Sequence, residues 1–431
     1  MINVAKLGAE IQGKNSNYLR KYKGHLDGPG FKFLKSCFNG ILRSKSIFIA
    51  RIALHLGEKI SRKKTEERLS YHLSKPMMSD TLTSAYLKAN HKDISNQKYI
   101  IWDGSAISKG YAKKMEGLTY VHDGASKKKN KLEMGYHWDN VVGVNKTESG
   151  ETKIFPIYSE IYSKKLDPCI SNYSENTKIL DTHLKISPYL SSDSIVVMDR
   201  GYDRKTLIEP LIERSQNFII RQTGRRNLEY PDGSGSVSLK KLSSRTNLRY
   251  EYIVNPVKGE NRIFKAGAKK VKFPECTSGK TLWLVTAQEA GKGKTWFLSY
   301  LDTSYEKEAV MTTMEGYTYR WKIEEYHRQI KQNFNLNKIK VMKYEAIKSL
   351  GVLLLITTGF ISRLFNLMEA DTRLKLLKAV NLINSESEKD IPRYFYYKAT
   401  EAVRMLISNI YRKRKRKSYD QFCCLQPLLE L

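Results

Sequence analysis

The chain has 431 residues, which favours two or three domains over one. Hydrophobic residues make up 41% of it, enough for a sizeable core, and this argues against a wholly disordered chain. Lysine and arginine number 75 against 44 acidic residues, a formal net charge of +31. Such a surplus attracts polyanions, nucleic acid first, because neutralised phosphates release their condensed counterions.

An anionic membrane is the alternative partner for this charge. The N-terminus lacks the apolar core of a signal peptide. The most apolar stretch, Leu350–Phe365, contains Gly, Thr, Ser and Arg and falls short of the ~20 apolar residues of a spanning helix. The five cysteines form neither a disulfide framework nor a CxxC pair, which fits a reducing compartment without structural zinc. We therefore expect no membrane partner and a cytoplasmic location, in a bacterium or archaeon, on chromosomal or plasmid DNA.

Residues 1–95 are predicted to form a helical DNA-binding domain. Phe31–Gly57 carries apolar residues at helical spacing, and another helix is expected over Lys64–Leu73, beginning near Ser61. Lysines and arginines cluster around this second helix, as they do in modules that dock on DNA. The alternative is a solvated basic face on a small helical bundle.

Residues 96–368 are predicted to form an α/β catalytic domain. Lys98–Trp102 and Ser194–Met198 are short apolar runs typical of buried strands, and each ends at an aspartate. Strand and helix patterns alternate around them, which indicates a mixed sheet. A β-rich insertion is expected over about 223–300, where the helical pattern gives way to short β runs. The remainder, 369–431, is predicted to be a basic helical region and includes the run RKRKRK over 412–417.

The two aspartates that follow these runs, Asp103 and Asp199, are candidate metal ligands. Two-metal phosphodiester chemistry needs several carboxylates that converge on cations about 4 Å apart. A strand end suits such a ligand, because the sheet fixes the backbone while the side chain projects clear of it. Taken singly, an aspartate in this position is more commonly a turn or helix-cap residue. Three further aspartates, Asp123, Asp139 and Asp203, are expected in turns or at the surface.

A third carboxylate is expected on a long helix over Glu315–Asn333. Arg320, Glu324 and Lys331 lie three, seven and fourteen residues after Tyr317, and these offsets put all four on one helical face. A purely structural stripe would consist of Leu and Ile, whereas this one carries an aromatic ring, two cations and an acid. Glu324 could hold a metal while the two cations bind flanking phosphates. The neighbouring Glu325 would point about 100° away from this face.

The spacing Tyr317-(2)-Arg320-(3)-Glu324-(6)-Lys331 resembles, in residue type and in spacing, the Y-R-E-K signature of the insertion-sequence-four family of DDE transposases. The motifs IIWDGSAISKG and VVMDRGYD look like the segments that carry this family's two aspartates. The resemblance covers roughly residues 60–365 and is weak at both ends.

The resemblance implies a ribonuclease H-like core in which three carboxylates hold two Mg²⁺ or Mn²⁺ ions: Asp103, Asp199 and Glu324. It further implies that three residues contact double-stranded DNA at the transposon ends: Tyr317, Arg320 and Lys331. Trp296, on the last insertion strand, would stack on an extruded base or serve as a core tryptophan. Arg200 would contact a phosphate or form a structural ion pair.

The function implied by the resemblance is cut-and-paste transposition. Metal-dependent hydrolysis frees a 3′-hydroxyl at a transposon end, strand transfer follows, and a homodimer holds the two ends together. Three alternatives remain: another two-metal nuclease on the same fold, a catalytically inactive DNA-binding relic, and a basic chromosome-packing protein. The nuclease needs no Tyr-Arg-Lys stripe, the relic would usually have lost a ligand, and the packing protein needs no aligned carboxylates.

Overall fold

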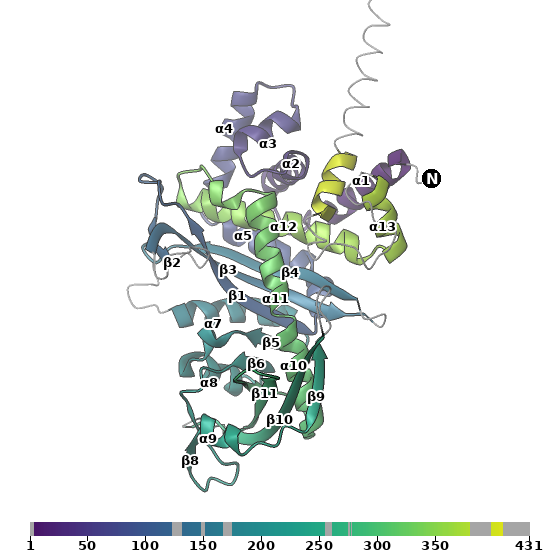
Figure 1. Ribbon diagram of the computed structural model, residues 1–431. Coiled ribbons are helices and arrows are strands. Elements are labelled where there is room, and N and C mark those ends of the chain that lie inside the picture. Colours follow the sequence, from purple (N-terminus) through teal and green to yellow (C-terminus); the bar gives the residue numbers. More distant parts are fainter. Residues whose placement is uncertain are drawn as a thin grey trace, which may run out of the picture.

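The computed structural model of the chain describes residues 4–122, 132–147, 151–166, 175–254, 261–274, 276, 278–379 and 398–407. Within these residues a mixed 12-stranded sheet runs through the molecule, with helices packed on both of its faces (Figure 1). Its main path is β2-β3-β1-β5-β6-β12-β11-β10-β7-β8, with β4 paired to β3 and β9 paired to β10. The predicted mixed α/β class is confirmed.

The first half of the sheet contains the strands that carry the candidate aspartates. They are β1 (Tyr99–Ser108), β2 (Thr119–His122), β3 (Leu132–Lys146), β4 (Thr152–Tyr162), β5 (Ile195–Met198) and β6 (Phe218–Arg221). β5 pairs in parallel with both β1 and β6. β3 pairs antiparallel with both β1 and β4. All four residues of β5 are buried, as expected of a strand covered on both faces.

Asp103 lies inside β1 and not at a strand end, so that part of the prediction was wrong. β1 continues to Ser108 because its whole length pairs with β3, from Tyr99–Val144 to Ser108–Gly135. The parallel pairing of β1 with β5, however, stops at Trp102–Met198. Asp103 and Asp199 are therefore the next residues after the last parallel pair, on two neighbouring strands.

The predicted β-rich insertion extends this same sheet. Its strands are β7 (Asn227–Glu229), β8 (Ser236–Ser238), β9 (Tyr250–Val254), β10 (Arg262–Lys272), β11 (Thr281–Glu289) and β12 (Lys294–Tyr300), and it also contains a short helix, α9 (Leu239–Ser244). β12 pairs antiparallel with β6, from Phe297–Arg221 to Tyr300–Phe218. The insertion is thus joined directly to the strands beside Asp199.

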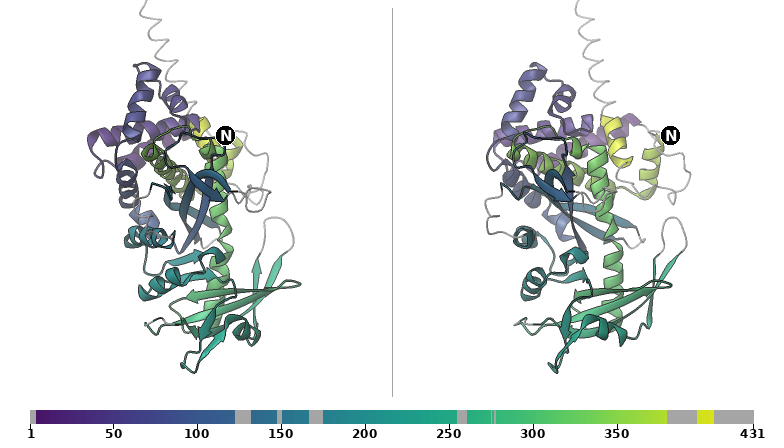
Figure 2. Two further views of the ribbon diagram at one scale, coloured as in Figure 1. Left: turned by 90° about the vertical axis from the view of Figure 1, so that its left-hand side faces the viewer. Right: turned by 60° about the vertical axis from the view of Figure 1, so that its left-hand side comes forward.

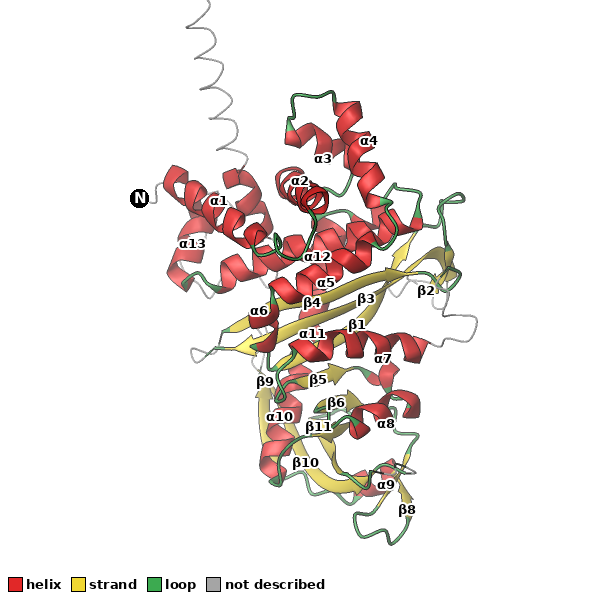
Figure 3. Cartoon of the chain, turned by 180° about the vertical axis from the view of Figure 1, so that it is seen from behind, coloured by secondary structure: helices red, strands yellow, loops and turns green. Residues whose placement is uncertain are grey.

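The N-terminal segment is helical, as predicted. Its helices are α1 (Val4–Arg20), α2 (Gly28–Ser44), α3 (Ile49–Leu56), α4 (Arg62–Leu73), α5 (Met78–Ala89) and α6 (His91–Ser95). The helix predicted near Ser61 is α4, and the Ser61 hydroxyl accepts a hydrogen bond from the backbone N–H of Lys64, which caps the helix start. The predicted Phe31–Gly57 helix is divided into α2 and α3. Four of these helices, α1, α2, α4 and α5, pack against α12 (Tyr344–Asn366), and Figure 3 shows the group above the sheet.

Helix α12 is long and apolar enough to cross a membrane, but most of it is buried inside the protein. It packs against β4 and α5, and its Gly351 lies against the side chain of Ile161 on β4. A core helix of a globular protein has these properties. The expectation that the stretch is too short to span a membrane was wrong, because the helix begins at Tyr344, six residues before Leu350.

Other helices cover the two faces of the sheet at β5 and β6. α7 (Glu175–Ile186) and α8 (Lys205–Glu213), coloured teal, lie on one side, and α10 (Glu306–Thr318) and α11 (Trp321–Arg328), coloured green, lie on the other (Figure 2). Helices α13 (Ala370–Ala379) and 398–407 follow α12. The basic run 412–417 lies outside the described residues, as does Asp123.

The single helix predicted over Glu315–Asn333 is broken, so that expectation was wrong. α10 ends at Thr318, α11 begins at Trp321, and a π-helical turn, η3, follows over Gln329–Asn333. At the first break the Arg320 N–H bonds to the carbonyl of Tyr317, three residues back instead of four. This tighter turn changes the register of the helix where the candidate site residues begin.

Gly316 sets how closely α10 can approach the sheet, because a Cβ there would meet side-chain atoms of Tyr99 and Ile219 at 2.8 Å. We expect Gly316→Ala to lower the free energy of unfolding by about 1–3 kcal/mol through overpacking. Gly13 on α1 is the matched control, since nothing lies within 4 Å of its added Cβ. Gly13→Ala should instead stabilise its helix by roughly 0.5–1 kcal/mol. Urea unfolding of both variants measures this, and equal effects would contradict the close packing of α10.

Candidate active site

Asp103 and Asp199 lie side by side on the face of the sheet covered by α10 and α11. Asp199 follows β5 as the N-cap of a short 3₁₀ turn, η2 (Arg200–Tyr202), and accepts a hydrogen bond from the backbone of Arg200. Their side chains are 25% and 30% exposed, so both can be reached from solvent. The register of two parallel strands therefore brings two carboxylates to one place.

Tyr317, near the end of α10, holds Asp199 in position. Its hydroxyl donates a 2.9 Å hydrogen bond to Oδ1 of Asp199 and accepts a 3.2 Å bond from Nη1 of Arg221. The Tyr317 ring packs against Phe297 of β12, with ring centroids 4.7 Å apart. Tyr317 is thus fixed by the insertion and in turn fixes the second aspartate.

Arg320 is a buried cation between the acids. Only 7% of the residue is exposed. Its Nη2 donates a 2.9 Å hydrogen bond to Oε1 of Glu324, and its Nη1 lies 3.8 Å from Oδ2 of Asp103. Its Nε has no hydrogen-bond partner among the described residues. A buried charge is stable only when it is paired, so this guanidinium and the carboxylates depend on each other.

The electrostatic environment shifts the pKa values of the two aspartates in opposite directions. Burial raises the pKa of Asp103 to about 6; Arg320 opposes this rise, and the charges of Asp199 and Glu324 add to it. Burial acts on Asp199 in the same direction, but the hydrogen bonds from Arg200 and Tyr317 hold its pKa below the usual range, with help from nearby arginines. At neutral pH Asp199 is therefore ionised, whereas the pKa of Asp103 lies much closer to neutral pH.

Lys331 lies in the π-helical turn and reaches the same strand as Asp103. Its Nζ donates a 2.8 Å hydrogen bond to Oγ of Ser105, two residues further along β1. The ammonium also lies 5.9 Å from the ring centroid of Trp138. Although the predicted helix is broken, Tyr317, Arg320 and Lys331 all reach the sheet where the aspartates lie.

A hollow of about 680 Å³ lies beside Asp199 and has a basic, partly aromatic lining. Arg200 contributes an exposed side chain, and Arg221, Arg225 and Lys294 add further positive charge. Trp296 is half-buried there: its Nε1 donates a 2.7 Å hydrogen bond to Oγ of Ser243, and its ring packs on Gly224. The indole of Trp296 therefore packs within the insertion and also lines the hollow.

Arg221 is a site residue that the sequence analysis missed. It ends β6, contacts Asp199 at 3.7 Å and bonds to Tyr317. A signal was present in the sequence: Phe218–Ile220 is an apolar run that ends at a polar residue, the same pattern that pointed to the two aspartates.

Within the described part of the chain, no three acidic, histidine or cysteine side chains are arranged to hold a metal ion. The kind of donor nevertheless fits a hard cation, because Asp103, Asp199 and Glu324 offer only oxygen ligands. Glu324 is paired with Arg320 in this structure. The residues therefore fit Mg²⁺ or Mn²⁺ chemically, with an internal cation already among them.

Residues 168–359 match the transposase DDE domain. The match supports a DDE transposase and indicates transposase function. It covers fewer than half of the 431 residues and includes Asp199, Glu324 and the Tyr317–Lys331 segment, while Asp103 lies before it. Among curated proteins, none matches the chain.

Of the two described aspartates expected in turns or at the surface, Asp203 lies at the end of a turn and Asp139 lies elsewhere. Asp139 is buried in β3 opposite Gly104, because β3 runs alongside β1 in the middle of the sheet. Asp203 does follow the turn η2, but its side chain is 2% exposed and pairs with Arg226 at 2.6 Å. It also accepts hydrogen bonds from the backbone and hydroxyl of Thr223. Asp203 thus ties the loop after Asp199 to the start of the insertion.

The buried Asp139 gives a pH-dependent prediction. Burial raises its pKa to about 7, with Glu160 and Glu175 adding to the rise. The unfolded value is about 3.9, so the folded protein holds an extra proton between about pH 4 and 7 and loses stability as pH rises through that range.

We expect Asp139→Asn to remove this loss. Between pH 5 and pH 8 the melting temperature of the wild type should fall by a few degrees relative to that of the variant, since the cost of ionising Asp139 is of order a few kcal/mol. Calorimetry of both proteins across this range checks it. Parallel curves for the two proteins would show that Asp139 is ionised without cost in the fold.

Proposed function

We propose that the chain is a cut-and-paste DNA transposase of the insertion-sequence-four type. The observation that carries the proposal is that Tyr317, Arg320 and Lys331 reach three neighbouring positions of the sheet: Asp199, directly after β5, and Asp103 and Ser105, both on β1. A structural helix would present apolar side chains at these positions. The match of residues 168–359 to the transposase DDE domain supports the same reading.

In this proposal Asp103, Asp199 and Glu324 hold two Mg²⁺ or Mn²⁺ ions. Such ions activate the attacking oxygen and stabilise the leaving one in phosphodiester cleavage and strand transfer. Tyr317 and Arg221 orient Asp199 through their hydrogen bonds, so its carboxylate keeps one direction while the DNA is bound. Arg320 neutralises the acids before the DNA arrives.

The partner in this proposal is double-stranded DNA, at the transposon ends and then at the target. The hollow beside Asp199 offers phosphates a cluster of cations within reach of a candidate ligand: Arg200, Arg221, Arg225 and Lys294. Backbone phosphates attract such side chains whatever the base sequence. Trp296 is placed in the same hollow, where a base that leaves the helix could stack on its accessible edge.

A ribonuclease H-like core within 96–368 is supported by the strand order β4-β3-β1-β5-β6. The pairing is antiparallel on one side of β1 and parallel on the other. Residues 1–95 would bind DNA, and 369–431 would form a basic helical region. A homodimer would hold two transposon ends, in the cytoplasm of a bacterium or archaeon.

Cleavage of a labelled duplex that carries the element's own end sequence tests the function. Wild type, Glu324→Gln and Glu325→Gln are compared with Mg²⁺, Mn²⁺ and EDTA. We expect metal-dependent cutting by wild type and a loss of at least about 100-fold in Glu324→Gln, because a metal ligand is lost. Glu325 is the matched control, since it pairs with Lys322 at 3.2 Å, and its variant should still cut.

The inactive relic and the other two-metal nuclease predict different results in this assay. Normal cutting by Glu324→Gln would show that the triad is wrongly assigned. Binding of the end without cutting by the wild type would favour an inactive DNA-binding relic. Cutting without preference for the end sequence would favour another two-metal nuclease.

The position of Arg320 predicts competition between its guanidinium and a bound metal. Arg320→Met should bind Mn²⁺ about tenfold more tightly than wild type in the absence of DNA, because Glu324 loses a charge-assisted hydrogen bond of roughly 1.5–3 kcal/mol. Lys322→Met, on the same helix, is the control and should bind Mn²⁺ as wild type does. Isothermal titration measures these affinities. An unchanged or weaker affinity in Arg320→Met would mean that the arginine does not hold Glu324 away from metal.

A further inference from the structure

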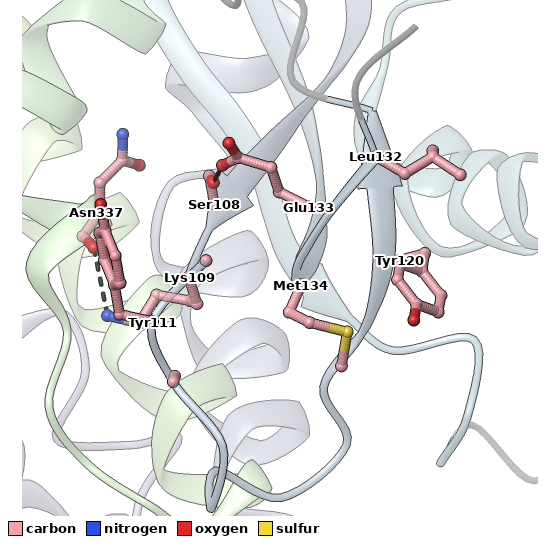
Figure 4. A pocket seen from close by; sticks show the side chains of 10 residues that line it. Ser108, Lys109, Tyr111, Tyr120, Leu132, Glu133, Met134 and Asn337 are labelled. Carbon is pink, nitrogen blue, oxygen red and sulfur yellow. Dashed lines mark hydrogen bonds between the residues drawn. The ribbon is translucent and has the colours of Figure 1, made fainter.

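A second hollow, of about 560 Å³, lies at the far end of β1 from the carboxylates. Tyr111, in the loop after β1, and Tyr120, on β2, stand on opposite sides of it, with Met134 of β3 between them (Figure 4). Lys109 and Leu132 also line it. We call this feature the tyrosine hollow.

The rings of the tyrosine hollow are unusually exposed. Tyr111 is fully exposed and Tyr120 is 67% exposed, and Leu132 beside them is 59% exposed. Single exposed apolar side chains are common on proteins, but several around one hollow mark a binding surface. Tyrosine rings normally bury most of their large area, so an occupant that covers both rings would be stabilised.

The surroundings of the tyrosine hollow are basic. The Nζ of Lys109 donates hydrogen bonds to the carbonyls of Asn337 and Ile339, which fix the ammonium at the rim. Burial and the neighbouring Lys340 lower the pKa of Lys109. Lys113 and Lys114 follow in the same loop and are exposed. The one acid in the lining, Glu133, accepts a hydrogen bond from Ser108.

Exposed aromatic rings within a cationic rim suit a nucleic-acid strand. Cations alone are sufficient to bind a duplex, because its phosphates supply most of the affinity. Aromatic rings gain contact only with bases that have left the base-paired stack. The combination therefore favours unpaired bases over an intact duplex.

The strand that carries Asp103 also leads to this hollow. Ser108 lies five positions after Asp103, which at roughly 3.3 Å per residue is about 17 Å along β1. For a strand that stays in the duplex between the two places, at about 3.4 Å per nucleotide, this corresponds to about five nucleotides. Lys331, bonded to Ser105, lies along the same path.

We propose that the tyrosine hollow binds unpaired bases of a DNA strand, about five nucleotides from the phosphodiester held at the carboxylates. This inference rests on the proposed function and adds a second contact for the same DNA. Tyr111 and Tyr120 stack on the bases, and Lys109, Lys113 and Lys114 neutralise the adjacent phosphates.

The test uses the full chain and DNA that carries the element's end sequence with a single-stranded tail on either strand. 2-Aminopurine is placed at successive tail positions, and its fluorescence is read on binding. We expect quenching to be strongest about five nucleotides from the cleavage site. The double variant Tyr111→Leu, Tyr120→Leu should lose this quenching and bind tailed DNA at least about fivefold more weakly, while Tyr111→Phe, Tyr120→Phe keeps the rings and the quenching. Tyr305→Leu, at another exposed tyrosine, is the control.

The outcomes separate this inference from the function on which it rests. Equal quenching by wild type and the leucine double variant overturns the stacking site while leaving the transposase proposal in place. An equal loss of affinity for tailed and fully paired DNA also overturns it, since unpaired bases would then have no special contact. If wild type binds no DNA at all, both proposals fail.

Discussion

The parallel pairing of β1 with β5 is the constraint on which the candidate site depends. Because that ladder ends at Trp102–Met198, the next residue on each strand projects its side chain at the same place and on the same face. Both of these residues are aspartates, so the fold forces two like charges together. The rise in the pKa of Asp103 records part of that electrostatic cost.

Arg320 offsets the repulsion between these acids with a positive charge. Its buried guanidinium contacts Glu324 and lies near Asp103, and the nearby acids in turn hold its own pKa above the usual value although burial acts in the opposite direction. The tight turn at the break between α10 and α11 is where this arginine enters the site. A cluster of acids that needs a cation can be folded before any metal or DNA is bound, provided that the cation is supplied by the chain itself.

The sequence predicted the features that depend on local pattern. The apolar run before Asp199 marked β5, and Ser61 marked the start of α4, because a strand core and a helix cap are encoded by neighbouring residues. The position of Asp103 inside a longer strand depends on β3, whose pairing residues lie more than 25 positions away in the chain. The burial of Asp139 has the same origin. The local sequence pattern around Asp103 or Asp139 does not show which distant strand pairs with it.

The insertion shows why the geometry of the site also depends on distant parts of the chain. β12 pairs with β6, Phe297 of β12 packs against the Tyr317 ring, and Tyr317 bonds to Asp199. Arg221 ends β6 and completes this set of contacts. The direction of one candidate ligand is therefore fixed by a segment nearly a hundred residues further along the chain. A change in the packing of the insertion should alter Asp199 as directly as a change in β5 itself.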